Sequence, residues 1–168
     1  EERGSCPDAE EYGFKERFSN KTAIAPTASI SIICGGASPG VEPIAANSYT
    51  HKTLSGSYNV RNKYLKKLLE KHGKNDDETW STITTNQGSV SHLDFLTDHE
   101  KDLFKTAFEL NQKWIIELGS DRTPYVSQAQ SINIFLPADV HKKELHQIHF
   151  QAWKKGLKSL YYCRSKSI

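Results

Sequence analysis

The segment with the clearest chemical potential is PTASIS at residues 26–31, which follows an apolar stretch and contains three hydroxyl side chains. We expect a turn or the start of a helix here, where hydroxyl residues such as Thr27 and Ser29 cap free N–H groups. Small side chains let the backbone approach phosphate oxygens, and the helix dipole favours an anion. No GK[ST] follows, so an ordinary capped helix start is favoured over phosphate binding on composition alone.

A second candidate is the pair of adjacent phenols, Tyr161 and Tyr162, within the apolar string LYYC at residues 160–163. This string predicts a short strand, and neighbouring residues on a strand point to opposite faces. The ordinary interpretation is that one ring packs and the other is exposed. The functional alternative is redox or proton transfer, because a tyrosine can release a proton and an electron together.

The histidines and cysteines offer weaker candidates. His146 and His149 are three residues apart on a predicted helix, with His141 nearby, but Glu144 is the one acidic residue at useful spacing. Helix-surface histidines are therefore favoured over a metal site. The three cysteines form no CxxC pair, so neither zinc nor a disulfide framework is indicated, and a reducing compartment is the default. Cys34, at the end of an apolar run, is predicted to be a small buried residue.

The composition limits the classes of partner. The chain has 168 residues, 22 basic and 20 acidic side chains and a net charge of +2, which is too balanced for a nucleic-acid or membrane surface. No apolar run reaches the roughly 20 residues of a membrane span, and the N-terminal residues do not resemble a signal peptide. We therefore expect a cytoplasmic protein that is one domain or a large fragment of one.

The elements in the first half are predicted from caps and turns. Residues 1–21 are polar and indicate a loop-rich lead-in with at most one helical turn, and residues 53–60 suggest two short extended stretches around Gly56. Asn62 can cap a helix that ends near Gly73. Residues 78–85 fit either a short helix or a loop.

The second half predicts longer elements. Thr97 and Glu100 form a capping box before a helical stripe, which predicts one long helix to about Leu118 that includes Leu103 and Trp114. Residues 131–138 alternate like a strand with one apolar face. A final helix is expected from a cap at Asp139 to about residue 157, with Trp153 facing inward. Together these elements predict a helix-rich α/β architecture.

Three segments resemble the large subunit of class I ribonucleotide reductases, the ribonucleoside-diphosphate reductases. TAIAPTASISIICGGASPGVEPIAANSYTHKTLSG, at residues 22–56, resembles the family's segment around its substrate-phosphate loop. SQAQSINIFLPA, at residues 127–138, resembles a late barrel strand, and HFQAWKKGLKSLYYCRS, at residues 149–165, resembles the last helix and strand. The segments come in the family's order and near its spacing, and the likeness covers nearly the whole chain.

The resemblance implies a fold and two sets of site residues. The chain, taken as a single fragment over residues 1–168, would be the C-terminal portion of the family's ten-stranded α/β barrel. The substrate diphosphate would be held by Pro26, Thr27, Ala28, Ser29 and Ile30. The radical would pass through Tyr161 and Tyr162, with Tyr161 nearest the thiyl site.

The resemblance also implies what must come from elsewhere. The family's active-site cysteines would lie before Glu1, so this piece is expected to be inactive alone and to bind no metal or cofactor itself. It would need the N-terminal part of the large subunit, a small radical-generating subunit with a metal or radical cofactor, and a thioredoxin- or glutaredoxin-type reductant. The substrate would be a ribonucleoside diphosphate, and a homo-oligomer is expected. The alternative is a non-catalytic helical binding or assembly domain that keeps the fold.

Overall fold

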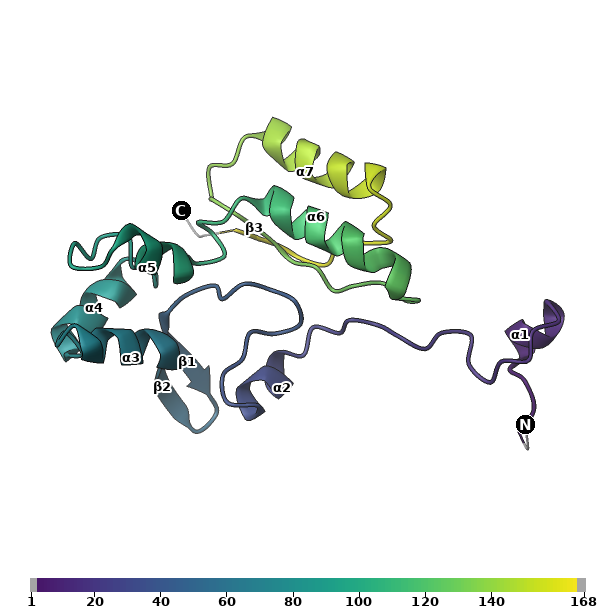
Figure 1. Ribbon diagram of the computed structural model, residues 1–168, viewed down its shortest axis with the longest axis horizontal. Helices are drawn as coiled ribbons and strands as arrows, with labels where there is room; N and C mark the ends of the chain where they lie inside the picture. Colours follow the sequence, from purple (N-terminus) through teal and green to yellow (C-terminus); the bar gives the residue numbers. More distant parts are fainter. Residues whose placement is uncertain (1–2, 166–168) are drawn as a thin grey trace.

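The computed structural model describes residues 3–165 as a helix-rich α/β structure, which confirms the predicted class (Figure 1). The helical elements are α1 (Pro7–Glu11), α2 (Ala28–Ile33), α3 (Lys63–Lys71), α4 (Asp77–Thr85), α5 (Asp98–Leu103), α6 (Gln112–Arg122), the 3-10 turn η1 (Thr123–Tyr125) and α7 (Lys142–Lys154). The strands are β1 (Ser48–Thr53), β2 (Gly56–Arg61), β3 (Ile134–Leu136) and β4 (Cys163–Ser165). The polar lead-in with the short helix α1 extends away from the rest of the described residues.

The first packed body combines a hairpin with three helices. Strands β1 and β2 pair antiparallel, with Thr53 opposite Gly56, which confirms the extended stretches predicted around that glycine. The Asn62 side chain accepts hydrogen bonds at the start of α3, and Gly73 adopts φ 65° after its end, so both predicted helix signals are confirmed. The core of this body consists of Leu65, Leu69, Trp80, Ile83, Val90, Leu93 and Leu96.

Residues 78–85, which the sequence fitted as either a short helix or a loop, lie in helix α4. The Asp76 carboxylate accepts a hydrogen bond of 2.7 Å from the Thr79 backbone N–H, which caps the first turn. Trp80 and Ile83 are buried on the same face against α3. Capping and burial together decide the helix, because propensity alone is weak over so few residues.

The long helix predicted after Thr97 is wrong, although its capping box with Glu100 is present. The helix α5 ends at Leu103, and α6 begins only at Gln112. Between them the Glu109 carboxylate accepts hydrogen bonds from the N–H and the hydroxyl of Thr106, which closes a turn. The break rotates the apolar stripe, so Leu103 and Trp114 are about two-thirds exposed.

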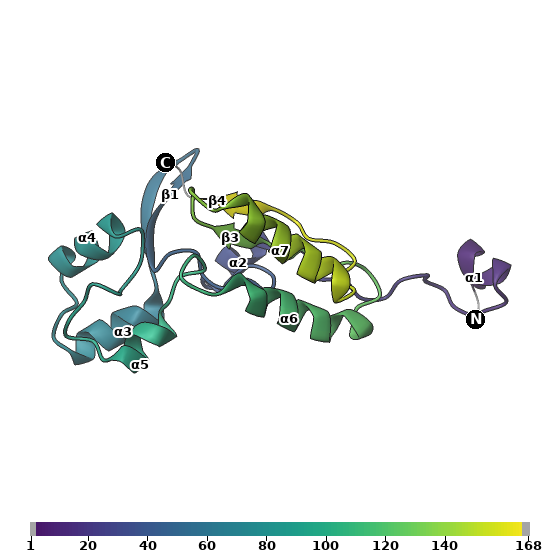
Figure 2. The ribbon, with the colours of Figure 1, turned by 90° about the horizontal axis from the view of Figure 1, so that it is seen from above.

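The second packed body places α6 and α7 side by side next to β3 and β4 (Figures 1 and 2). Strands β3 and β4 pair in parallel, with Ile134 opposite Cys163. The core is formed by Ile116, Ile132, Ile134, Leu136, Ile148 and Ala152. The strand prediction is confirmed but the single apolar face is not, because Phe135 on the other face is also buried, edge-on to Phe108.

Helix α7 begins later than predicted. His141, not Asp139, caps it through a hydrogen bond from the Lys143 N–H to Nδ1. Trp153 is 73% exposed and lies beside Phe150 on the outer face, so its predicted inward orientation is wrong. Only Ile148 and Ala152 of this helix are fully buried, since one narrow stripe faces α6 and β3.

The strands of residues 3–165 form two separate two-stranded sheets and no closed barrel. The parallel direction of β3 and β4 is typical of α/β folds, in which helices cover the sheet. A further parallel bridge joins Ile24 to Gln130, so the chain before α2 runs beside the chain before β3. No helix in this part of the chain is long and apolar enough to cross a membrane.

Candidate functional site

The PTASIS segment forms the start of α2, with Thr27 at the N-cap position in the left-handed conformation, φ 51°. Its side chain makes no cap hydrogen bond, so the predicted hydroxyl cap is wrong. The Thr27 hydroxyl instead accepts a hydrogen bond of 2.7 Å from the Gly40 N–H. The first N–H groups of a helix have no partner inside it, so those of Ala28, Ser29 and Ile30 remain available to an acceptor outside the helix.

Gly40 packs closely against the backbone that precedes α2. Its φ is +55°, and a Cβ there would lie 3.1 Å from the Ala25 carbonyl oxygen and 3.6 Å from that of Pro26. Glycine therefore allows both the turn and the close approach of the two backbones. Ala28, Ser29 and Ile30 are exposed. The structure thus presents a short exposed backbone of small residues, braced by the segment that contains Gly40.

The rings of Tyr161 and Tyr162 lie side by side, with 4.1 Å between their centroids and 51° between their planes. The prediction that they point to opposite faces is wrong, because both residues precede β4 and do not adopt its alternation. The Tyr161 N–H donates to the Ile132 carbonyl at 2.8 Å, and the Tyr162 carbonyl accepts from the Ile134 N–H at 2.9 Å. These bonds hold the pair against the chain around β3.

The surroundings of Tyr161 raise its pKa and favour the protonated phenol. The side-chain hydrogen bond with Tyr162 raises the pKa of Tyr161, and charge repulsion and desolvation add to this effect, while Arg164 opposes it. The guanidinium carbon of Arg164 lies 5.8 Å from the centre of the Tyr162 ring. Both rings are about half exposed. Where one ring of such a contacting pair carries a tyrosyl radical, the phenol beside it can give that radical its hydrogen atom.

Asn133 contacts the backbone of Tyr162, and Glu42 contacts Asn133, although the sequence pattern indicated neither residue. Asn133 occupies a polar position in the alternating string SINIFLPA, which predicted exposure, yet it is only 2% exposed. Its amide Nδ2 donates to Glu42 Oε1, and its Oδ1 accepts from the Tyr162 N–H at 2.9 Å. Burial raises the pKa of Glu42, while Arg164 and the Asn133 hydrogen bond lower it.

The remaining sequence candidates have ordinary surroundings. His141 caps α7, His146 stacks on Phe150, and His149 contacts the Leu145 carbonyl through Nδ1. Across residues 3–165 no three His, Cys, Asp or Glu side chains gather in a way that could hold a metal ion.

Cys34 is exposed at the end of α2, which corrects its predicted burial. The apolar run that suggested a buried position forms α2, and Ser31 is its one buried residue.

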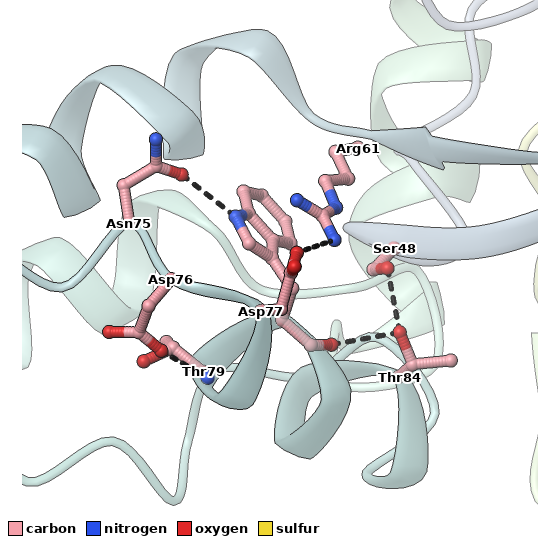
Figure 3. Close-up of polar contacts among 8 residues, drawn as sticks. Ser48, Arg61, Asn75, Asp76, Asp77, Thr79 and Thr84 are labelled. Carbon is pink, nitrogen blue, oxygen red and sulfur yellow. Dashed lines mark hydrogen bonds and ion pairs between the residues drawn. The ribbon is translucent and has the colours of Figure 1, made fainter.

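A separate polar cavity of about 400 Å³ lies between the hairpin and α4. Figure 3 shows the polar contacts among residues in this region. The Arg61 guanidinium lies over the Trp80 ring, 5.1 Å from the centroid, and forms an ion pair of 2.8 Å with Asp77. Thr84 links the two elements, because its hydroxyl bonds both Ser48 and the Trp80 carbonyl. These contacts fix the hairpin on α4.

The parallel β3–β4 pair with α6 and α7 beside it is typical of α/β proteins, in which helices cover a parallel sheet. The family model for the ribonucleotide reductase barrel domain matches residues 7–163. The chain therefore belongs to the ribonucleotide reductase barrel family, and the predicted membership and fold are confirmed.

Curated relatives and a solved structure agree with this assignment. The chain is 52% identical to the ribonucleoside-diphosphate reductase large subunit of Invertebrate iridescent virus 6, over 99% of this chain and 18% of that protein. It is 45% identical to the corresponding protein of Invertebrate iridescent virus 3, over 99% of this chain and 26% of that protein. The solved class Id ribonucleotide reductase alpha subunit of Actinobacillus ureae is 40% identical, with a TM-score of 0.82 over 95% of this chain and 28% of that chain. The chain thus spans 18% to 28% of the length of these relatives.

Proposed function

We propose that this chain is part of an enzyme that reduces ribonucleoside diphosphates to deoxyribonucleoside diphosphates by radical chemistry. The observation that carries the proposal is the conjunction of family membership with an exposed small-residue loop and a contacting tyrosine pair in the same chain. Neither feature is informative alone, because loops of small residues and adjacent tyrosines are common in proteins of other functions.

The substrate's diphosphate would bind at Pro26, Thr27, Ala28, Ser29 and Ile30. The outward N–H groups of the first turn of α2 can donate to phosphate oxygens, and the exposed Ser29 hydroxyl can add another donor. The Thr27 hydroxyl accepts from Gly40 and keeps its own hydrogen for a ligand. Gly40 holds the loop in place, so little order has to be imposed when the ligand binds.

The tyrosine pair would carry the radical between the small subunit and the active-site cysteine. A radical on Tyr162 takes the phenolic hydrogen atom of Tyr161, which leaves Tyr162 as a phenol and the radical on Tyr161. The Tyr161 radical then takes the hydrogen atom of the cysteine thiol. The contact between the rings and the raised pKa of Tyr161 support this role, because each step needs a phenol that retains its proton.

The rest of the chemistry would come from other parts of the assembly. We expect the chain to need the N-terminal part of the large subunit with its cysteines, a small subunit that generates the radical with its own metal or radical cofactor, and a thioredoxin- or glutaredoxin-type reductant. We place the activity in the cytoplasm, where reducing conditions would keep Cys6, Cys34 and Cys163 as thiols. A homo-oligomer is expected, and no metal is assigned to this segment.

Two measurements test the proposal. First, CDP is titrated into the chain by calorimetry, and Ser29→Ala is expected to weaken the binding. Second, the chain is combined with a complementary N-terminal piece and a small subunit, and deoxyribonucleotide formation is followed. Tyr161→Phe is expected to abolish the product, whereas Tyr125→Phe, at a tyrosine 83% exposed and outside the pair, is expected to retain it. If neither CDP binding nor Tyr161-dependent activity is observed, a non-catalytic helical binding or assembly domain is the better description.

A further inference from the structure

Three hydrogen bonds and the backbone of residues 40–42 join the loop at α2 to the tyrosine pair. This connection begins at the Thr27 hydroxyl, which holds the Gly40 N–H. Two residues further on, the Glu42 carboxylate accepts from the amide of Asn133. The other end of the same amide accepts from the Tyr162 N–H. Two regions far apart in the sequence are therefore connected through one buried side chain.

The polarity of the Asn133 amide allows it to serve both neighbours. Its nitrogen can only donate and meets a carboxylate, while its oxygen can only accept and meets a backbone N–H. The side chain is 2% exposed, so water can replace neither bond without opening the structure. A buried amide that is bonded through both its nitrogen and its oxygen has little freedom, so a displacement of Glu42 would be transmitted to the Tyr162 backbone.

We infer that Asn133 is a positioning residue that couples occupancy of the loop at Pro26–Ile30 to the relative placement of the Tyr161 and Tyr162 rings. The inference rests on the proposed function, because the ligand of the loop is taken to be a nucleoside diphosphate. An anion bound at the first turn of α2 contacts the backbone on either side of Thr27. The hydroxyl of Thr27 carries that displacement to Gly40, and the 40–42 segment carries it to Asn133.

The structural consequence lies in the tyrosine rings. The backbone of Tyr162 is held by Asn133 on its N–H and by Ile134 on its carbonyl. A small rotation of this backbone changes how the Tyr162 ring meets its neighbour 4.1 Å away. Hydrogen-atom transfer depends steeply on geometry, so the presence of substrate would adjust the relay before any radical passes.

Substitutions of Asn133 and of its partner Glu42 can distinguish coupling between the loop and the tyrosines from a purely structural role of Asn133. Asn133→Asp keeps the acceptor for the Tyr162 N–H but replaces the donor to Glu42 with a second carboxylate. Adding Glu42→Gln supplies an N–H on the opposite partner, so the double variant rebuilds the bond with reversed polarity. Glu42→Ala removes the link and leaves the bond between Asn133 and Tyr162, which provides a second broken variant if Asn133→Asp does not fold.

The experiment uses the full chain labelled with ¹³C in its tyrosine rings. The loop is perturbed in two ways, by saturating CDP and by Gly40→Ala, whose Cβ would press on the Ala25 carbonyl oxygen. The ring resonances of Tyr161 and Tyr162 are followed by NMR, with Tyr58 in the hairpin as the internal reference. Calorimetry measures CDP binding on the same samples.

We expect both perturbations to shift the Tyr161 and Tyr162 resonances in the parent chain and to leave Tyr58 unchanged. The shifts should be lost in Asn133→Asp and in Glu42→Ala, and should return in the double variant. Equal shifts in the broken variants, or no recovery in the double variant, would overturn the coupling. If CDP fails to bind, the proposed function fails for this chain, and the Gly40→Ala shifts still decide the coupling.

Discussion

The hydrogen bond between the Gly40 N–H and the Thr27 hydroxyl can be tested as the contact that keeps the loop at α2 ordered. Thr27→Val removes the hydroxyl that accepts the Gly40 N–H at 2.7 Å, while it retains the size and the β-branch of the side chain. Both side chains meet the same cost at φ 51°, so backbone strain is unchanged between parent and variant. Thr27→Ser is the matched control, because it keeps the hydroxyl and loses only a methyl group.

The expected magnitude follows from the bond that is lost. A partly buried N–H left without its acceptor costs roughly 1–3 kcal/mol, which corresponds to about 5- to 140-fold in an opening equilibrium. The assay is hydrogen exchange at the Gly40 amide, because it reports local opening of this segment as well as global unfolding. We expect exchange at Gly40 to accelerate by that factor in Thr27→Val and to change little in Thr27→Ser.

A specific result would refute this reasoning. If Gly40 exchanges at nearly the parent rate in Thr27→Val, the hydroxyl does not brace the loop. If Thr27→Ser accelerates exchange as much as Thr27→Val, the methyl group and not the hydroxyl is responsible. In the expected case, CDP should also bind more weakly to Thr27→Val than to Thr27→Ser, because the loop would then be less ordered before binding.

Three further predictions concern stability. A Cβ at Gly88 would lie 2.6 Å from Ala46 Cα at φ +82°, so Gly88→Ala should destabilise the chain by roughly 2–4 kcal/mol in urea unfolding, and an unchanged midpoint would contradict this. Leu69 is fully buried, so Leu69→Ala should cost about 2–5 kcal/mol, which a loss below about 1 kcal/mol would exclude. Hydrogen bonds from His72, and then from the capping box, lower the pKa of Glu100 to about 2. Because the pKa of Glu100 is depressed in the folded state, its stabilisation is present above the ordinary carboxyl pKa of 4.5 and is lost as the pH falls towards 2. Glu100→Gln should flatten the pH dependence of stability in that window, and an unaltered profile would count against the contact.

Local signals predicted local structure well. The sequence predicted three helix-end signals correctly: the cap at Asn62, the glycine after α3 and the capping box at Thr97. Each of these signals depends on residues within a few positions of one another. The loop at α2 and the tyrosine pair were recognisable for the same reason, since both are short continuous strings. Their chemistry was expected from residue type and resemblance, and their assignment to substrate and radical remains a prediction.

Features that depend on distant contacts were predicted poorly. The helical stripe after Thr97 continues in the sequence, yet the turn closed by Thr106 and Glu109 divides it. Trp153 and Cys34 are apolar or small residues that the sequence placed inside, and both are exposed in the fold. Burial depends on which surface meets which, and apolar periodicity does not specify the opposite surface.

The sequence by itself determined which residues can do chemistry, the small hydroxyl-rich loop at one end and the paired phenols at the other. Only the tertiary structure decided that the two are connected. Glu42 and Asn133 are 91 positions apart, and nothing local distinguishes Asn133 from the exposed polar residue that strand alternation predicts. Pairing β3 with β4 buries both faces of the strand and brings the Asn133 amide between the loop segment and Tyr162. The reason is physical: a buried amide must find both a donor and an acceptor, and only the folded chain supplies them.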